Sequence, residues 1–149
     1  MNNNQDEFIG KWLGLAHLKL FNLLTKMLHK EGFDLTFEQL ILLKIINANE
    51  GVSQQELASI MNKDKTSITR AISILENHHK VVRISSRDDK RKKGLFLTKE
   101  GKEHLALIMP RFIEIKNEIE KGFDKQDLDQ AIVTIKKIVE RTNQLEKQL

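Results

Sequence analysis

The sequence predicts a mainly α-helical fold of the α+β class, with six helices and one β-hairpin in the order α-α-α-α-β-β-α-α. Helix start signals followed by apolar residues at helical spacing recur along the chain. Between residues 53 and 79, two of the predicted helices are short and are separated by a tight break. After them, β-branched and apolar residues flank a charged segment, which is typical of a hairpin with a long tip.

The first two helices have clear start and stop signals. Residues 8–30 carry apolar side chains at helical spacing, and Gly32 follows as a stop signal. Thr36 and Gln39 have the spacing of a capping box, in which each side chain accepts a hydrogen bond from a backbone N–H of the other residue. The helix that starts there ends before Gly51 and is apolar nearly all round, so we expect it at the centre of the core.

The pair of short helices follows directly. Ser53 and Glu56 form a second capping box, and a break at residues 62–63 separates this helix from the next. Asp64 is a good N-cap for a helix over about residues 65–79. The apolar residues of the pair define two inner faces: Leu57, Ala58 and Met61 on the first helix, and Ile68, Ala71, Ile72 and Leu75 on the second.

The hairpin and the last two helices complete the expected order. Residues 81–84 and 95–97 are the predicted strands, and a short additional strand is expected near Val52. Thr98 caps a helix that ends before Gly122, and Asp124 caps a helix that continues to the C-terminus.

The positive charge of the chain is concentrated in its middle. The net charge of the whole chain is +4, yet residues 60–100 alone hold 11 basic and 5 acidic side chains, a net charge of +6. A basic segment between near-neutral ones is expected of a surface that binds a polyanion. On charge alone, a solvated charged loop is an equally good interpretation.

Segment 53–97 has the pattern of a winged helix-turn-helix, because two short helices precede a charged hairpin. In such a pair the second helix enters the DNA major groove with its N-terminal residues on the base edges. Arginine and lysine can donate to guanine, and hydroxyl groups can bond bases or phosphates. The predicted contacts from this helix are Lys65, Thr66, Ser67, Thr69 and Arg70.

The hairpin tip, residues 87–93, is rich in cations. Four consecutive basic residues on a thin projection suit a minor groove or a track of phosphates, where the potential is most negative. Asp89 can orient Arg91 through a charge-assisted pair. The predicted DNA contacts from the tip are Arg87, Lys90, Arg91, Lys92 and Lys93.

From Leu57 to Gly101 the sequence resembles the multiple-antibiotic-resistance regulator (MarR) family of transcription regulators. The matching residues are Leu57-Ala58, the run 64–70, Leu75-Glu76, the wing residues Asp89-Lys90-Arg91, and Leu97-Thr98-Lys99-Glu100-Gly101, which fits the family's Leu-Thr-x-x-Gly. The wing motif followed by Leu-Thr-x-x-Gly is the specific part of the resemblance. It implies that Arg91 enters the minor groove and that Asp89 orients it.

Two residues depart from the family pattern after Leu75-Glu76. The family has a glycine at the end of the recognition helix and then a bulky apolar residue, whereas this chain has His79 and Lys80. Histidine tolerates a left-handed backbone better than most residues, though less well than glycine. The departure raises a question of local strain and does not argue against the fold.

The two ends of the chain carry more apolar surface than one small winged domain can cover. Intrachain packing is one interpretation, and the resemblance implies the other, a helical dimer interface built from both ends. Residues 1–149 are then one MarR-like domain. Residues 36–98 form its winged helix-turn-helix, and residues 8–30 and 99–149 are its dimerisation helices.

The function that the resemblance implies is a sequence-specific DNA-binding transcription regulator, a repressor that acts as a homodimer on a palindromic operator in double-stranded DNA. Many relatives respond to small phenolic or anionic ligands bound between the dimer helices and the winged domain. Phe8, Trp12 and Phe37 are the candidate residues for such an effector, with ordinary core packing as the alternative.

Two alternatives belong to other classes. One is a winged-helix protein–protein interaction module, which would have little use for the cations of residues 90–93. The other is a non-specific architectural DNA-binding protein, against which the small polar residues at the start of helix 65–79 argue weakly.

The residues that catalysis, metal binding, secretion or membrane insertion would need are not found in the sequence. The chain has no cysteine, no Gly-rich phosphate loop and no catalytic motif, so we expect neither an enzyme nor a cofactor. His78 and His79 are adjacent and point about 100° apart on a helix, so they cannot grip one metal ion together. The polar N-terminus is not a signal peptide, and no apolar run is long enough for a membrane span. These features predict a cytoplasmic protein.

Overall fold

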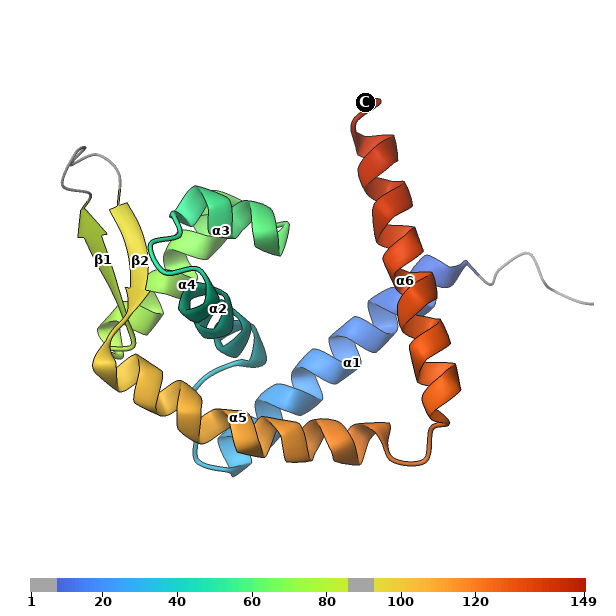
Figure 1. Cartoon of the computed structure of the whole chain (residues 1–149), viewed down its shortest axis with the longest axis horizontal. Helices are drawn as coiled ribbons and strands as arrows, with labels where there is room; N and C mark the ends of the chain where they lie inside the picture. The colour runs from blue at the N-terminus through green and yellow to red at the C-terminus, as the bar shows by residue number, and fades with distance from the viewer. Residues whose placement is uncertain (1–7, 86–92) are drawn as a thin grey trace, which may run out of the picture. The chain divides into compact units, whose positions relative to one another are not determined.

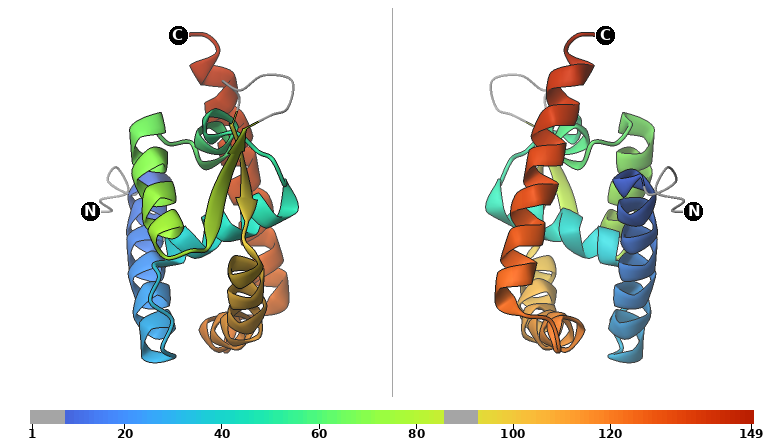
Figure 2. Two further views of the ribbon diagram at one scale, coloured as in Figure 1. Left: turned by 90° about the vertical axis from the view of Figure 1, so that its left-hand side faces the viewer. Right: turned by 90° about the vertical axis from the view of Figure 1, so that its right-hand side faces the viewer.

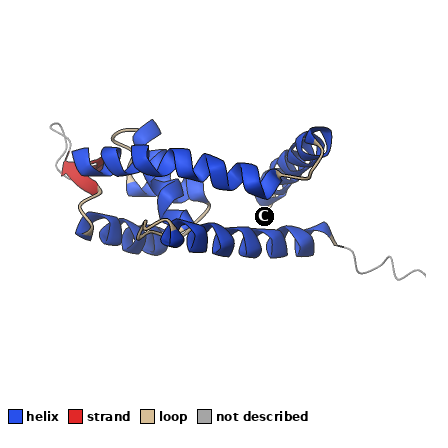
Figure 3. Cartoon of the chain, turned by 90° about the horizontal axis from the view of Figure 1, so that it is seen from below, coloured by secondary structure: helices blue, strands red, loops and turns tan. Residues whose placement is uncertain are grey.

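The computed structural model describes residues 8–85 and 93–149. The helices and strands follow the predicted order (Figure 1): α1 (Ile9–Lys30), α2 (Phe37–Ala48), α3 (Gln54–Met61), α4 (Lys65–Asn77), β1 (Val81–Ser85), β2 (Lys93–Leu97), α5 (Lys99–Glu120) and α6 (Lys125–Glu146). The chain divides into two compact units, one up to Ile115 and one from Lys116 to the C-terminus, so α5 runs from the first unit into the second. Helices predominate, and the two strands occupy one small region (Figure 3).

The core of the first unit lies around α2, as the sequence predicts. Leu40, Leu42 and Ile46 of this helix are fully buried. Helix α4 faces them with Ile68 and Ile72, which are also fully buried. Burial of each large aliphatic side chain contributes about 1.5–3 kcal/mol to stability relative to exposure. The packing of α4 on α2 therefore fixes the position of α4.

The predicted helix caps are present. Thr36 and Gln39 form a complete capping box at α2, and Ser53 and Glu56 form another at α3. The break between α3 and α4 is made by Asn62, which has a left-handed backbone with φ 49°. A single left-handed residue turns the chain sharply, so the two short helices follow each other without a longer loop.

The hairpin is antiparallel and is joined by a short third segment. Arg83 pairs with Leu95 in its register, and Val52 forms the additional β-bridge with Leu95 that the sequence predicts. Gly94 permits this approach, because a Cβ there would lie 2.7 Å from the carbonyl oxygen of Gly51. The middle of β2 is thereby attached to the loop before α3, and the hairpin stands beside α4 (Figure 2).

Helix α4 ends at Asn77, two residues before the predicted end near residue 79. His79 takes the left-handed backbone with φ 56° where the family has a glycine. The Lys80 side chain is 15% exposed and pairs through its ammonium with Glu100, which resolves how a lysine replaces an apolar residue. That hydrogen bond holds the pKa of Glu100 below its ordinary value.

The second unit contains the end of α5 and all of α6. Every residue of α6 is described, and none of them is buried. Asp124 accepts a hydrogen bond from the backbone N–H of Gln126 and caps the helix as predicted. Of the helices that the structure describes between residues 8 and 149, none has the length and hydrophobicity of a membrane span.

Candidate nucleic-acid interface

Helix α4 presents two opposite faces. Its inner face is buried through Ile68, Ile72 and Leu75, which are at most 2% exposed. The five residues of this helix that are predicted to contact DNA lie together and exposed on its first two turns: Lys65, Thr66, Ser67, Thr69 and Arg70. The core therefore holds the helix in place while its N-terminal end faces solvent.

Both donors of Ser67 are used in the N-cap of α4. Its hydroxyl donates to Oδ2 of Asp64 at 2.6 Å, and its backbone N–H donates to Oδ1 at 2.8 Å. These bonds from the hydroxyl and then the backbone of Ser67 lower the pKa of Asp64. The carboxylate next to the exposed face is thus anionic but already satisfied by local donors.

Thr69 uses its hydroxyl within the protein. The hydroxyl donates to the backbone carbonyl of Lys65 at 2.8 Å and accepts a hydrogen bond from the Gln54 side chain, also at 2.8 Å. Its methyl group remains for contact with a base, for example with the methyl group of thymine.

Lys65, Thr66 and Arg70 are the members of the set whose side chains are uncommitted. Within residues 8–85 and 93–149, none of these three side chains has a hydrogen-bond or ion-pair partner. Arg70 carries five donors in a fixed plane, which match the two acceptors of guanine in the major groove. The exposed face thus offers the long side chain of Arg70 together with the polar side chains of Lys65 and Thr66.

Three residues that the sequence interpretation did not select form a continuous polar chain with Thr69 beside this face. We call Thr69, Gln54, Arg83 and Glu76 the Gln54 network. Gln54 donates to Thr69, and its carbonyl oxygen accepts from Nε of Arg83 at 3.1 Å. Nη1 of Arg83 makes an ion pair with Glu76. Arg83 belongs to the basic segment by composition, yet its guanidinium is bound inside the protein.

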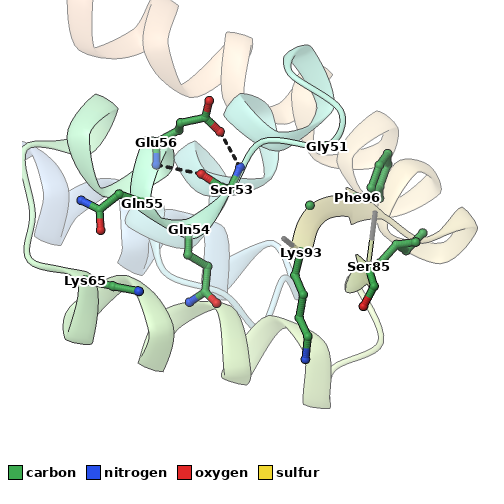
Figure 4. Close-up of a pocket in the computed structure, with 11 residues that line it drawn as sticks. Gly51, Ser53, Gln54, Gln55, Glu56, Lys65, Ser85, Lys93 and Phe96 are labelled. Carbon is green, nitrogen blue, oxygen red and sulfur yellow. Dashed lines mark hydrogen bonds between the residues drawn. The ribbon is translucent and has the colours of Figure 1, made fainter. Parts of the chain in front are cut away.

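A groove of about 750 Å³ separates the start of α3 and α4 from the hairpin (Figure 4). Lys65 lies on the α4 side and Lys93 on the hairpin side, with Ile84 and Phe96 among the apolar lining residues. The two cations stand on opposite sides of the groove, and Glu56, whose carboxylate accepts a hydrogen bond from the backbone N–H of Ser53, lines it as well.

The predicted tip residues Arg87, Asp89, Lys90, Arg91 and Lys92 lie outside the described residues. Lys93 is described. It is the first residue of β2, and it is exposed.

The three candidate effector residues differ in exposure. Phe8 and Trp12 are 75% and 55% exposed. Phe37 is half-buried, and its described ring partners are Phe21, at 4.8 Å between centroids, and Phe112, at 5.6 Å. In the part of the chain that the structure describes, no group of three or more His, Asp or Glu side chains has the arrangement of a metal site.

The buried core, the short helix pair and the hairpin define a winged helix-turn-helix protein. The sequence model of the MarR family matches residues 35–93. The transcriptional regulator YybA of Bacillus subtilis (strain 168), described as HTH-type, is 31% identical over 115 residues, which cover 74% of this chain and 76% of that protein. The chain therefore belongs to the MarR family.

Two further relatives extend the comparison. The transcriptional repressor MprA of Escherichia coli (strain K12) is 25% identical over 129 residues, which cover 87% of this chain and 73% of that protein. A MarR family regulator from Listeria monocytogenes, solved in complex with a 26mer DNA, is 26% identical, with a TM-score of 0.77 over 91% of this chain and 89% of that one. Members of this family are transcription regulators and not enzymes, so this chain is a transcription regulator.

Proposed function

We propose that the protein is a homodimeric repressor that binds a palindromic operator in double-stranded DNA in the cytoplasm. Residues 36–98 read the DNA, and residues 8–30 and 99–149 form the dimer. The observation that carries the proposal is the exposed, cationic first part of α4 on a helix whose other face is buried in the core.

In this proposal α4 enters the major groove with its N-terminal end. Arg70 donates to guanine, while Lys65 and Thr66 contact phosphates or neighbouring bases. Lys93 contacts the phosphate backbone, and the rest of the wing, Arg87, Lys90, Arg91 and Lys92, contacts the adjacent minor groove, with Asp89 orienting Arg91. The DNA complex of the Listeria monocytogenes relative supports DNA as the partner.

A homodimer is supported by the apolar residues that the terminal helices leave uncovered. On α1, Ile9, Trp12 and Leu15 are 44–55% exposed, and on α6, Ile132 and Val139 are 50% and 52% exposed. Contiguous exposed apolar faces of this kind mark association surfaces. A two-fold dimer then presents two copies of α4 to two half-sites about one helical turn, or a multiple of it, apart.

Repression, and release by a small phenolic or anionic ligand, are the finer parts of the proposal. The name of the relative MprA supports repression. Trp12 is the single tryptophan of the chain, so its fluorescence reports ligand binding near α1 without labelling. We expect at least one small aromatic acid to change this fluorescence and to weaken operator binding. Phe37→Leu tests whether the aromatic residues of the first unit take part.

The deciding experiment is selection of binding sites from random duplex DNA, followed by titration of the selected and a scrambled duplex at fixed salt. The proposal predicts a palindromic consensus and a strong preference for it. Equal affinity for both duplexes would favour an architectural DNA-binding protein. Binding to neither duplex would favour the protein–protein interaction module.

A further inference from the structure

We propose that Gln54 is a positioning residue that joins the recognition helix α4 to the wing strand β1, so that the two DNA-contacting elements act as one body. The inference rests on the proposed DNA-binding function for its consequence, but the coupling itself is a property of the free protein. It assigns a role to the Gln54 network, which contributes no uncommitted group of its own to the exposed face of α4.

The amide of Gln54 has only one orientation that satisfies both neighbours. Thr69 donates its hydroxyl hydrogen to the carbonyl of Lys65, so it can only accept from Gln54. The guanidinium of Arg83 has donors and no acceptor, so it needs the carbonyl oxygen of Gln54. A rotated amide would lose both bonds. The first residue of α3 therefore fixes the relative positions of α4 and β1 (Figure 4 shows Gln54 directed at α4).

The network contacts α4 at two positions along the helix axis. Thr69 and Glu76 are seven residues apart and lie on the same side of the helix, about 10 Å apart along its axis. Gln54 connects Thr69 to Arg83, and Arg83 connects directly to Glu76. One contact would leave β1 free to pivot on α4, whereas two contacts along the axis also fix the angle between them.

The ion pair of the network, between Arg83 and Glu76, is partly sheltered from water. The side chains of Arg83 and Glu76 are 21% and 26% exposed, well below the 92% and 62% of the surface pair Lys99–Glu103. Partial burial makes charge-assisted hydrogen bonds stronger and less sensitive to salt than surface pairs. Because Arg83 pairs with Leu95 across the hairpin, holding β1 also holds β2 and therefore Lys93.

The consequence for DNA binding is preorganisation. When helix and wing are rigidly joined, contact of one places the other at its groove, so the entropy of ordering the second element is already lost in the free protein. The interactions of Arg70 and Lys93 with DNA should then be coupled, although the two residues lie on different elements.

The first test measures the coupling without DNA. The chain has no cysteine, so Asn77→Cys on α4 and Ser85→Cys on β1 give one pair of spin labels, diluted with unlabelled chains to suppress pairs between subunits. We expect one narrow distance distribution in the otherwise unchanged protein and a broader one after Gln54→Leu. Gln55→Leu, which changes the exposed neighbouring glutamine, is the matched control. Equal widths in all three proteins would overturn the inference.

The second test uses a selected operator. In a double-mutant cycle, Arg70→Ala and Lys93→Ala should have non-additive effects on operator affinity, and Gln54→Leu should make them additive. Gln54→Leu should also lower the operator-to-scrambled affinity ratio about tenfold, the size of one charge-assisted hydrogen bond, whereas Gln55→Leu should not. Non-additivity that persists after Gln54→Leu would reduce the network to a contribution to stability. A broadened label distribution in a protein with no operator preference would support the coupling and refute the proposed function instead.

Discussion

Apolar side chains are buried in the segment from α2 to β2, whereas most of them are exposed on the terminal helices α1 and α6. Between α2 and β2, nine large aliphatic side chains are at most 2% exposed: Leu40, Leu42, Leu43, Ile46, Leu57, Ile68, Ile72, Leu75 and Leu95. Helix α6 has no buried residue, and α1 buries only Leu24 and Leu28. The first region completes its core within one chain, whereas the terminal helices leave apolar surface that a second chain can cover.

Many polar groups of the segment from α2 to β2 also have their hydrogen-bond partners within the chain. Its caps and the Gln54 network use the polar groups of Ser53, Asp64, Thr69 and Arg83 inside the protein. A small set of exposed cations and one hydroxyl then stands out against this background. Exposed groups without a partner in the described part of the chain therefore indicate where other molecules bind. They are apolar at the chain ends and cationic on α4.

Removing core volume from the completed region should have the largest effect. Ile72→Ala leaves a cavity beneath α4, because Ile72 is fully buried. We expect a loss of about 2–5 kcal/mol in the free energy of unfolding. Urea denaturation monitored by circular dichroism measures it. The exposed Ser59→Ala on α3 is the control, and a loss below about 1 kcal/mol would show that the core is not packed as described.

A charge on the apolar face of α6 should act on assembly. Ile135 is 41% exposed, so an isolated chain should tolerate Ile135→Asp, while a dimer that buries this face should not. We expect association to weaken about hundredfold, a change of roughly 2.7 kcal/mol. Sedimentation equilibrium over a range of concentrations measures this. Lys136→Asp places the same side chain at the next, exposed residue, with a larger change of charge, and equal effects of the two variants would place the interface elsewhere.

Arg70→Ala should reduce specific binding more than non-specific binding. If Arg70 reads a base, its loss costs about 1–3 kcal/mol on the selected operator and much less on a scrambled duplex. The preference should relax at one position in each half-site, because the two-fold symmetry repeats the contact. Equal losses on both duplexes would make Arg70 a phosphate contact.

Lys93→Ala should weaken binding to every duplex by a similar factor. A phosphate contact releases counterions, so its loss reduces the slope of log K against log salt by about 0.9 for each contact. Titrations at four salt concentrations measure the slope. Lys99→Ala, an exposed lysine at the start of α5, is the comparison, and an unchanged slope after Lys93→Ala would mean that Lys93 faces only solvent.

The smallest effect concerns pH and His104 of α5. Burial, and then the neighbouring Lys80, lower the pKa of His104 from its ordinary 6.5, while Glu100 opposes them. The unfolded chain therefore binds this proton more readily than the folded one, so stability is present above about pH 6.5 and is lost as the pH falls below it. Thermal melts at pH 7 and pH 5 should differ less in His104→Leu than in the unchanged protein. His29→Leu, at an exposed histidine, is the control, and equal differences would contradict the assignment to His104.

Local signals in the sequence predicted the elements of this fold. Capping residues such as Thr36, Ser53 and Asp64 act over three residues, so their hydrogen bonds can be read directly from spacing. The bridge at Val52 and the exposed face of α4 followed from the same periodic patterns. The left-handed backbone at His79 was anticipated because the resemblance places a glycine there.

The Gln54 network could not be predicted in this way. Gln54 is 15 residues from Thr69 and 29 residues from Arg83, and each of the three fits an ordinary surface interpretation in its own element. Only the packing of α3, α4 and β1 brings them together. The exposure of Phe8 and Trp12 also depends on packing, whereas the sequence shows only that they are aromatic.

The central claim is that α4 of a dimer reads a specific operator, and titration of the unchanged protein against a selected and a scrambled duplex at one fixed salt concentration tests it most directly. The account predicts two chains per operator and an affinity at least about 1,000-fold higher for the operator, the lower end of the range for specific DNA-binding proteins. Equal affinity for the two duplexes, or one chain per operator, would contradict it.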